Sequence, residues 1–280
     1  MSKIKELFTY STADNATNWQ SVLEKQVCKY TGKKCYKVRK SAPDISIGTC
    51  TIEYGFSQKN IIICPSRLLE RKQIFMDCIH LLTHHVPGNE IHIVPEVTIP
   101  GGHVDFVLVS TDTNRKVKDF VGIELQTMDT TGSVWSERQR LVQSLNGTYP
   151  TDDIGKSYGI NWKMTAKTIL VQIHHKIQTF ESLNRHLVLV LQDCLLDYIK
   201  KEFNFECVSS NASIGDSMHF HAYELETKGN RYKLNLKERF STDKEGIALL
   251  LGLNANANMK FEEIANLLES KISDETLFQV

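Results

Sequence analysis

Two acidic residues stand inside apolar stretches of the kind that form buried β-strands. Asp105 lies in VDFVLV, and Glu124 lies in FVGIELQ. Burying an ionised carboxylate without a partner costs much free energy, so each acid requires a partner. The sequence offers no obvious lysine or arginine neighbour, although His103 is near Asp105. A divalent cation is the simplest partner, because carboxylates together with a backbone carbonyl, here that of Leu125, suit Mg²⁺.

The segments around these acids have the pattern of an α/β protein. Helical spacing of apolar residues and short alternating or apolar runs predict the elements. The expected helices are 66–86, 135–145 (opened by Ser136) and 193–203, and the expected strands are 90–99 (broken at Pro95), 103–110, 119–127, 166–175, 186–192, 219–226 and 231–238, followed by helical ends. This order favours a mixed sheet flanked by helices.

The strands should bring several polar groups to one place. If Gly101-Gly102 is a two-residue turn, Thr98 lies opposite Asp105, and Glu96 shares their face. On the expected strand 119–127, Glu124 and Gln126 are two residues apart and also share a face. The residues expected to converge, and the candidate catalytic residues, are Asp105, Glu124, Gln126 and Glu96.

Such a cluster suits the hydrolysis of phosphodiester bonds. A bound Mg²⁺ would lower the pKa of a water molecule and stabilise charge on phosphoryl oxygens. Gln126 would orient the water or the scissile phosphate. Two alternatives remain open: an edge strand with one polar face, and an acid that pairs with a distant arginine.

Charge is distributed unevenly along a chain of zero formal net charge. Residues 1–72 contain 13 Lys and Arg against 6 Asp and Glu, a net +7, so the remainder carries −7. A basic, DNA-facing lobe beside a carboxylate-bearing core gives this pattern, although any divided chain shows some asymmetry. The candidate DNA contacts are Arg39 and Lys40 in a basic stretch, and Arg138 in the helix that follows the third strand.

Seven cysteines occur in a chain that has no recognisable export signal and no run of 18 apolar residues. Disulfides and a membrane span are therefore not expected. We expect a cytoplasmic location. Four cysteines fall in the basic third, with gaps of 6, 14 and 13 residues: Cys28, Cys35, Cys50 and Cys64. They would hold Zn²⁺ or Fe as thiolates, or serve as small hydrophobic residues.

The acids and their surroundings resemble a known nuclease family. Asp105 followed by Glu124-Leu125-Gln126 resembles the PD-(D/E)xK signature, with Gln126 where that signature usually has lysine, which leaves the general base open. The longer strings GGHVDFVLVS, DFVGIELQTMDTTGSVW, KTILVQIHHK and HLVLVLQDCLLDYI are similar to NotI-type restriction endonucleases. The resemblance covers roughly residues 28–200.

This resemblance implies a PD-(D/E)xK nuclease core over residues 66–280 and a small lobe over residues 1–65 with a four-cysteine Zn or Fe site. It implies Mg²⁺-dependent cleavage of double-stranded DNA at a specific, GC-rich palindromic site, by a homodimer whose genetic partner is a DNA methyltransferase. Asp105, Glu124 and the Leu125 carbonyl would bind Mg²⁺. The alternatives are a non-catalytic DNA-binding protein and a structure-specific repair nuclease.

Overall fold

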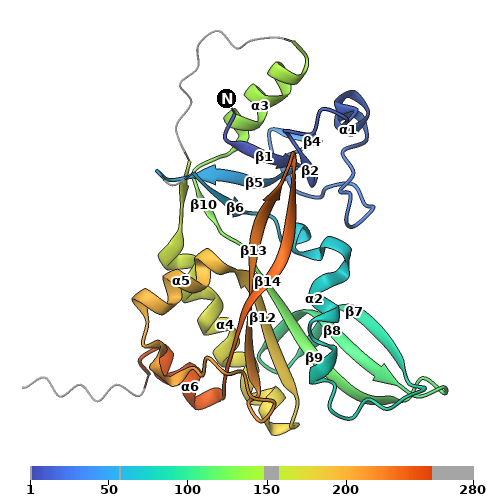
Figure 1. The fold of residues 1–280 in the computed structure, drawn as a ribbon, viewed down its shortest axis with the longest axis vertical. Helices are drawn as coiled ribbons and strands as arrows, with labels where there is room; N and C mark the ends of the chain where they lie inside the picture. Colours follow the sequence, from blue (N-terminus) through green and yellow to red (C-terminus); the bar gives the residue numbers. More distant parts are fainter. Residues whose placement is uncertain (1, 57, 148–157, 254–280) are drawn as a thin grey trace, which may run out of the picture.

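The computed structural model describes residues 2–56, 58–147 and 158–253. Within them, one large sheet forms a lower body and a smaller sheet forms an upper lobe (Figure 1). The large sheet has six strands in the order β14-β13-β12-β9-β8-β7 in the described part of the chain. These strands are β7 (Glu90–Ile99), β8 (Gly102–Thr111), β9 (Val117–Gln126), β12 (His186–Gln192), β13 (Met218–Lys228) and β14 (Arg231–Thr242).

The large sheet is mixed and helices flank it, as the sequence predicts. β7, β8 and β9 pair antiparallel, β12 runs parallel to both β9 and β13, and β14 closes an antiparallel hairpin with β13. The parallel pairs require crossover connections, which helices supply. These are α3 (Trp135–Leu145) and α4 (Trp162–Ser182) before β12, and α5 (Asp193–Glu202) after it.

Strand β12 lies at the centre of the body and is buried along its whole length. Its odd-numbered leucines, such as Leu189, join the core that includes α4, α5 and α6 (Lys244–Leu250). Its valines, Val188 and Val190, face the second core, built on residues 62–82. A strand covered on both faces needs a continuous apolar run, which explains the sequence HLVLVLQ.

The upper lobe is built on a four-stranded sheet in the order β2-β1-β5-β6. Its elements are β1 (Ile4–Leu7), β2 (Tyr10–Ser11), α1 (Trp19–Lys25), β3 (Val38–Arg39), β4 (Ala42–Ser46), β5 (Thr49–Tyr54) and β6 (Lys59–Ile62). Helix α3 also packs against β1, so a later segment contributes to this lobe. The short strands β10 (Thr130–Thr131) and β11 (Gly159–Ile160) pair nearby.

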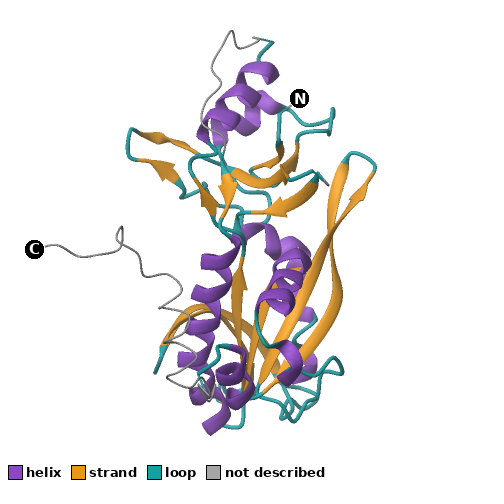
Figure 2. Cartoon of the chain, turned by 90° about the vertical axis from the view of Figure 1, so that its left-hand side faces the viewer, coloured by secondary structure: helices purple, strands orange, loops and turns teal. Residues whose placement is uncertain are grey.

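Two connections join the lobe to the body. The Gln192 side chain at the end of β12 accepts from the Ile62 N–H at 2.8 Å and donates to the Asn60 carbonyl at 2.7 Å. The β13–β14 hairpin extends beyond the body and runs up beside the lobe (Figure 2). At its tip, Nε of Arg231 lies 2.9 Å from Oδ2 of Asp14.

The prediction of one helix over residues 66–86 is wrong. The segment forms three short helices in place of one: η1 (Pro65–Lys72, a 3₁₀ helix with a kink), α2 (Gln73–Met76) and η2 (Ile79–Leu81, a 3₁₀ helix). The kink allows the Glu70 carboxylate to accept both from Arg67 at 2.9 Å and from the Leu234 N–H at 2.8 Å. Long-range polar contacts thus override the helical periodicity.

The prediction of a strand over residues 166–175 is also wrong, because this run lies inside the 21-residue helix α4. Its β-branched residues favour a strand locally. The buried positions, however, follow helical spacing: Ala166, Ile169, Leu170, Ile173, Ile177 and Phe180. The paired histidines, His174 and His175, therefore lie on a helix.

The β7–β8 hairpin turns at Pro100-Gly101, one residue earlier than the predicted Gly101-Gly102 turn. Ile99 pairs with Gly102, and Thr98 pairs with His103 rather than with Asp105. Proline fixes the first central position of such a turn, and Gly101 adopts the positive φ of 96° that the second requires. β7 continues through Pro95, with a local irregularity at Glu96, whose φ is 52°.

The remaining predicted elements are confirmed where the structure describes them. β8, β9, β12, α5, β13 and β14 occupy the expected segments, and α3 covers 135–145, with Val134 rather than Ser136 before its first turn. Of the expected helical ends, α6 lies among the described residues, and residues 254–280 lie outside them. None of the described helices combines the length and the apolarity needed to cross a membrane.

Candidate active site

Asp105 and Glu124 lie on neighbouring strands where the β8–β9 pairing ends. The antiparallel ladder continues as far as Phe106 and Ile123, so the two acids are the next residues on each strand. Oδ2 of Asp105 accepts from the Leu125 N–H at 2.8 Å, which fixes this carboxylate against β9. Asp105 is exposed and Glu124 is buried, so one acid faces solvent and the other lies beneath the surface.

Lys176 of α4 is the partner of Glu124 that the sequence does not reveal locally. Its Nζ lies 2.7 Å from Oε1 of Glu124, and both side chains are buried. Helical spacing aims Lys176 at the sheet, because it follows Ile173 by three residues and precedes Phe180 by four. The signal in the sequence is a charged residue on the apolar face of a helix, and the prediction of a strand concealed it.

The ionisation of Glu124 is finely balanced. Burial raises its pKa to about 7, the hydrogen bond and charge of Lys176 oppose this rise, and the nearby charge of Asp105 adds to it. A carboxyl group with a pKa near neutrality is typical of functional sites, although structural ion pairs also perturb pKa values. The protonation state of the buried Glu124 therefore depends on the charges of its neighbours, Lys176 and Asp105.

The β7–β8 turn fixes the part of α4 that carries Lys176. A Cβ atom on Gly101 would lie 2.2 Å from the His175 carbonyl oxygen, so only glycine allows this close approach. Thr179 Oγ1 also donates to the Pro100 carbonyl oxygen at 2.9 Å. The turn and the helix are therefore in direct contact beside the acidic pair.

The two other predicted site residues lie at the edges of this arrangement. Glu96 is exposed and lines the same pocket as Asp105. Gln126 is half-buried, and its Nε2 donates to the Thr127 carbonyl at 2.6 Å. This local hydrogen bond fixes the orientation of the whole side-chain amide of Gln126.

A pocket of about 370 Å³ lies between Asp105 and the upper lobe, and Glu124 is not among the residues that line it. Asp105, Glu96 and Leu125 form its wall on the body. All four N-terminal cysteines line it from the lobe: Cys28, Cys35, Cys50 and Cys64. Lys33 and Lys34 stand at the same pocket. Two of the predicted catalytic residues, Asp105 and Glu96, therefore share a cavity with the four cysteines of the predicted metal lobe.

The cysteines are free thiols. A hydrogen bond from the Cys50 thiol lowers the pKa of Cys64 to about 6 and raises that of Cys50. Burial raises the pKa of Cys35. Across residues 2–56, 58–147 and 158–253, no three or more His, Cys, Asp or Glu side chains form a group that could hold a metal ion. The four thiols thus share a pocket without forming a closed coordination sphere.

The three predicted DNA contacts have different surroundings. Lys40 is exposed, and the Arg39 guanidinium stacks over the Trp135 ring at 5.3 Å. Arg138 is buried, and it donates to the carbonyls of Ser46 and Ile47 at 3.3 and 3.4 Å. Its buried guanidinium joins α3 to the upper lobe, and a contact between Arg138 and DNA stays a prediction.

The family model of the restriction endonuclease NotI matches residues 24–234. The chain belongs to this family. Membership of the NotI family makes the protein a site-specific deoxyribonuclease of the type II restriction class, whose substrate is DNA. Restriction endonucleases typically use Mg²⁺. No curated protein matches the chain significantly.

Proposed function

We propose that this NotI-family protein cleaves double-stranded DNA at a specific, GC-rich palindromic site in a Mg²⁺-dependent reaction. Asp105 and Glu124 carry this proposal, because they lie side by side at the end of the β8–β9 ladder with Lys176 against Glu124. We take residues 66–280 as a PD-(D/E)xK core, and the mixed sheet with helices on both sides is consistent with that fold.

The residues present suit Mg²⁺. Asp105, Glu124 and the Leu125 carbonyl offer hard oxygen donors, and Mg²⁺ sites commonly combine one or two carboxylates with water and substrate phosphate. When bound, the ion would supply Lewis-acid stabilisation of charge on the phosphoryl oxygens. Such a two-carboxylate site needs no preformed group of three acidic or thiol ligands, so its absence from the described residues is compatible with it.

Each side chain has a distinct part in this proposal. Lys176 opposes the rise that burial causes in the pKa of Glu124 and brings positive charge to a centre that lacks lysine at position 126. Glu96, on the wall of the pocket, is a candidate to accept a proton from water. Gln126 would orient the scissile phosphate once its bond to the Thr127 carbonyl is exchanged.

We propose that residues 1–65 form a lobe in which Cys28, Cys35, Cys50 and Cys64 hold Zn or Fe. The thiols line one pocket, and the lowered pKa of Cys64 favours the thiolate form that metals bind. Metal binding would draw the four sulfurs together and stiffen the basic stretch that carries Arg39 and Lys40. Cleavage of both strands of a palindrome implies a homodimer. We place this action in the cytoplasm, with a DNA methyltransferase as the genetic partner.

The test is a digest of a long, sequenced DNA with the purified protein and Mg²⁺, beside the Glu124→Ala variant. Discrete fragments that the variant does not produce would support the proposal, and their ends would give the site. Cutting of branched DNA alone would instead favour a repair nuclease. DNA binding without any cutting would favour a non-catalytic DNA-binding protein.

A further inference from the structure

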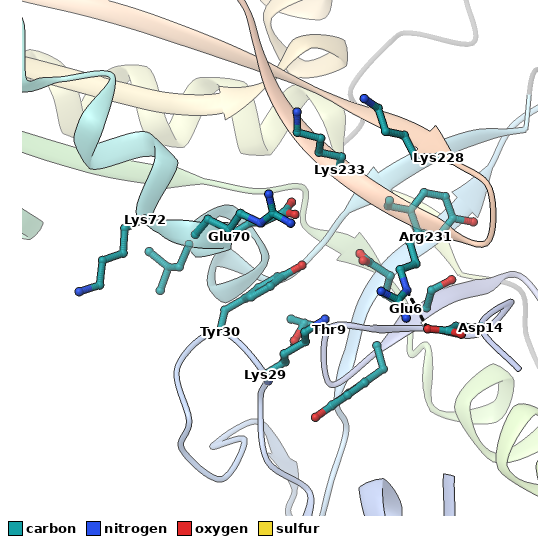
Figure 3. Close-up of a pocket in the computed structure, with 15 residues that line it drawn as sticks. Glu6, Thr9, Asp14, Lys29, Tyr30, Glu70, Lys72, Lys228, Arg231 and Lys233 are labelled. Atoms are coloured by element: carbon teal, nitrogen blue, oxygen red, sulfur yellow. Dashed lines mark hydrogen bonds and ion pairs between the residues drawn. The ribbon is translucent and has the colours of Figure 1, made fainter. Parts of the chain in front are cut away.

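A second, strongly basic cavity lies between the lobe and the β13–β14 hairpin. It measures about 600 Å³ and is walled by four separate segments: residues 6–14, the loop at residues 29–30, the turn at residues 69–72 and the hairpin tip at residues 228–233 (Figure 3). We call it the basic basin. Its cations are Lys29, Arg71, Lys72, Lys228, Arg231 and Lys233. None of them has a role in the catalytic proposal.

The acids around the basin are already paired. Glu6 and Glu70 both bind the buried Arg67, at 2.6 and 2.9 Å, and Asp14 binds Arg231 at 2.9 Å. No ion pair involves Lys29, Arg71, Lys72 or Lys233 within the described residues. The free charge of the basin is therefore positive and comes from three of its four walls.

The buried Arg67 holds these walls in a fixed arrangement. Its guanidinium lies 5.3 Å from the centre of the Tyr30 ring in the loop, and it donates to the Tyr232 carbonyl of the hairpin at 3.2 Å. Glu70 completes the connection by accepting from the Leu234 N–H of β14. A charged surface organised in advance costs less entropy when it binds a charged partner.

The basin adjoins the candidate active site. Leu69 lines both the basin and the pocket that contains Asp105. The loop also serves both cavities, because Lys29 and Tyr30 line the basin while Cys28 and Thr31 line the pocket. A chain of evenly spaced negative charges that entered the pocket would reach the basin next, and a DNA strand is such a chain, with one phosphate per roughly 3.4 Å of rise.

We propose that the basic basin binds backbone phosphates of the substrate DNA that flank the scissile phosphate. This inference rests on the proposed function, because it takes the pocket at Asp105 as the place of cleavage. Lysines and arginines without base contacts supply affinity that is independent of sequence and sensitive to salt. The basin therefore contributes to holding DNA and not to choosing its sequence.

The test measures binding of a fluorescein-labelled 30-base-pair duplex by anisotropy, without divalent ions, over a range of NaCl concentrations. The test variants are Arg71→Gln with Lys72→Gln on one wall, and Lys233→Gln on another. The matched control is Lys167→Gln with Lys201→Gln, two exposed lysines outside the basin. All the substituted side chains are at least partly exposed, and thermal melting checks that each variant folds.

We expect the double variant to bind at least about tenfold more weakly at low salt. Its slope of log affinity against log salt should be shallower by about 0.9 for each phosphate that the variant no longer neutralises, while the control keeps the wild-type values. Equal affinity and slope in the basin variants and the wild type would overturn the inference and leave cleavage untouched. Loss of binding to inorganic pyrophosphate alone, with DNA binding intact, would also overturn it, because the basin would then be a small-anion site. A wild-type protein that binds no duplex would overturn both this inference and the proposed function.

Discussion

Nζ of Lys176 lies 2.7 Å from Oε1 of Glu124, and both groups are buried between helix α4 and the end of strand β9. The lysine opposes the effect of burial on the pKa of Glu124, which still rises to about 7. This contact joins a helix to the strand pair that carries the acids. It also supplies positive charge to a centre whose strand sequence, Glu124-Leu125-Gln126, contains none.

Replacing Lys176 with methionine should keep the packing of α4 and remove the charge. We expect DNA cleavage to fall by about 100-fold or more, because an electrostatic stabiliser of the site is lost. The pKa of Glu124 should rise further, so the pH at which cleavage reaches half its maximum should move to higher values. Cleavage rates between about pH 6 and 9 measure both effects.

The matched control is Lys167→Met, an exposed lysine on the same helix. Lys176→Arg, which keeps the charge, should cleave DNA faster than Lys176→Met. If Lys176→Met lowered the rate without moving the pH profile, Lys176 would act on cleavage in another way than through the ionisation of Glu124.

Gly101→Ala should disturb the contact between the β7–β8 turn and α4. The new methyl group would lie 2.2 Å from the His175 carbonyl oxygen, in a backbone conformation with φ of 96°. We expect a loss of about 3 kcal/mol or more in the free energy of unfolding, from steric overlap added to backbone strain. Urea titration measures it.

Gly229→Ala separates strain from overlap. Gly229 has φ of 58°, and a Cβ atom at this position would meet no other atom within 4 Å. Only backbone strain of about 1 kcal/mol is therefore expected. Equal losses for the two variants would show that the close approach of the turn to α4 contributes nothing.

A buried histidine should make the protein sensitive to acid. Burial and the neighbouring His186 lower the pKa of His219 from its ordinary 6.5 to about 4. The folded state then binds fewer protons than the unfolded state between these values, so stability is full above pH 6.5 and falls as the pH decreases toward 4. The loss should reach the order of 3 kcal/mol at about pH 4.

His219→Gln should reduce this loss, as measured by urea titration at about pH 7 and about pH 5. His84→Gln, at an exposed histidine, is the control and should retain the wild-type dependence. Identical pH dependence in His219→Gln and the wild type would contradict a neutral, buried His219.

Cys50→Ser should weaken the proposed metal site of the upper lobe. The variant removes one of four thiols and also the donor that lowers the pKa of Cys64. We expect the purified protein to lose bound Zn or Fe, with a lower melting temperature and weaker DNA binding, because metal binding stabilises a small lobe. Elemental analysis of the protein measures the metal.

Cys207→Ser is the control for Cys50→Ser, because Cys207 lies outside the four-cysteine pocket. A wild-type protein that contained no transition metal after purification without chelators would contradict the metal site. The four thiols would then be small, partly buried side chains.

Much of the strand pair that carries Asp105 and Glu124 was predictable from the sequence. Residues 103–110 and 119–127 alternate or run apolar in a way that is typical of strands of a covered sheet, and the acids within them stand out. The predicted pairing of the β7–β8 hairpin is close to the observed one. The turn at Pro100-Gly101 moves the residue opposite Asp105 from Thr98 to Glu96, two residues along β7, so the same face of the strand still lies beside Asp105. PGGH offers two overlapping two-residue turns, and the contact of Gly101 with α4 selects between them.

The partner of Glu124 was not predictable from local sequence. The run AKTILVQIHH favours a strand by composition, and a strand would have placed Lys176 outside the structured core. The helix forms because its apolar side covers β12 and its neighbours, which is a tertiary effect. The break at Glu70 in the predicted helix over residues 66–86 is also a tertiary effect. It follows from an ion-pair network that joins residues distant in sequence.

The most direct test of the catalytic assignment is the single-turnover cleavage rate of Asp105→Asn on a DNA fragment with one mapped site, with binding of that fragment measured in parallel. The assignment predicts a rate at least about 1,000-fold below wild type, with binding affinity unchanged or higher, because the carboxylate that is removed repels phosphate when no metal is bound. Wild-type cleavage by Asp105→Asn would contradict it and place the chemistry elsewhere in the chain.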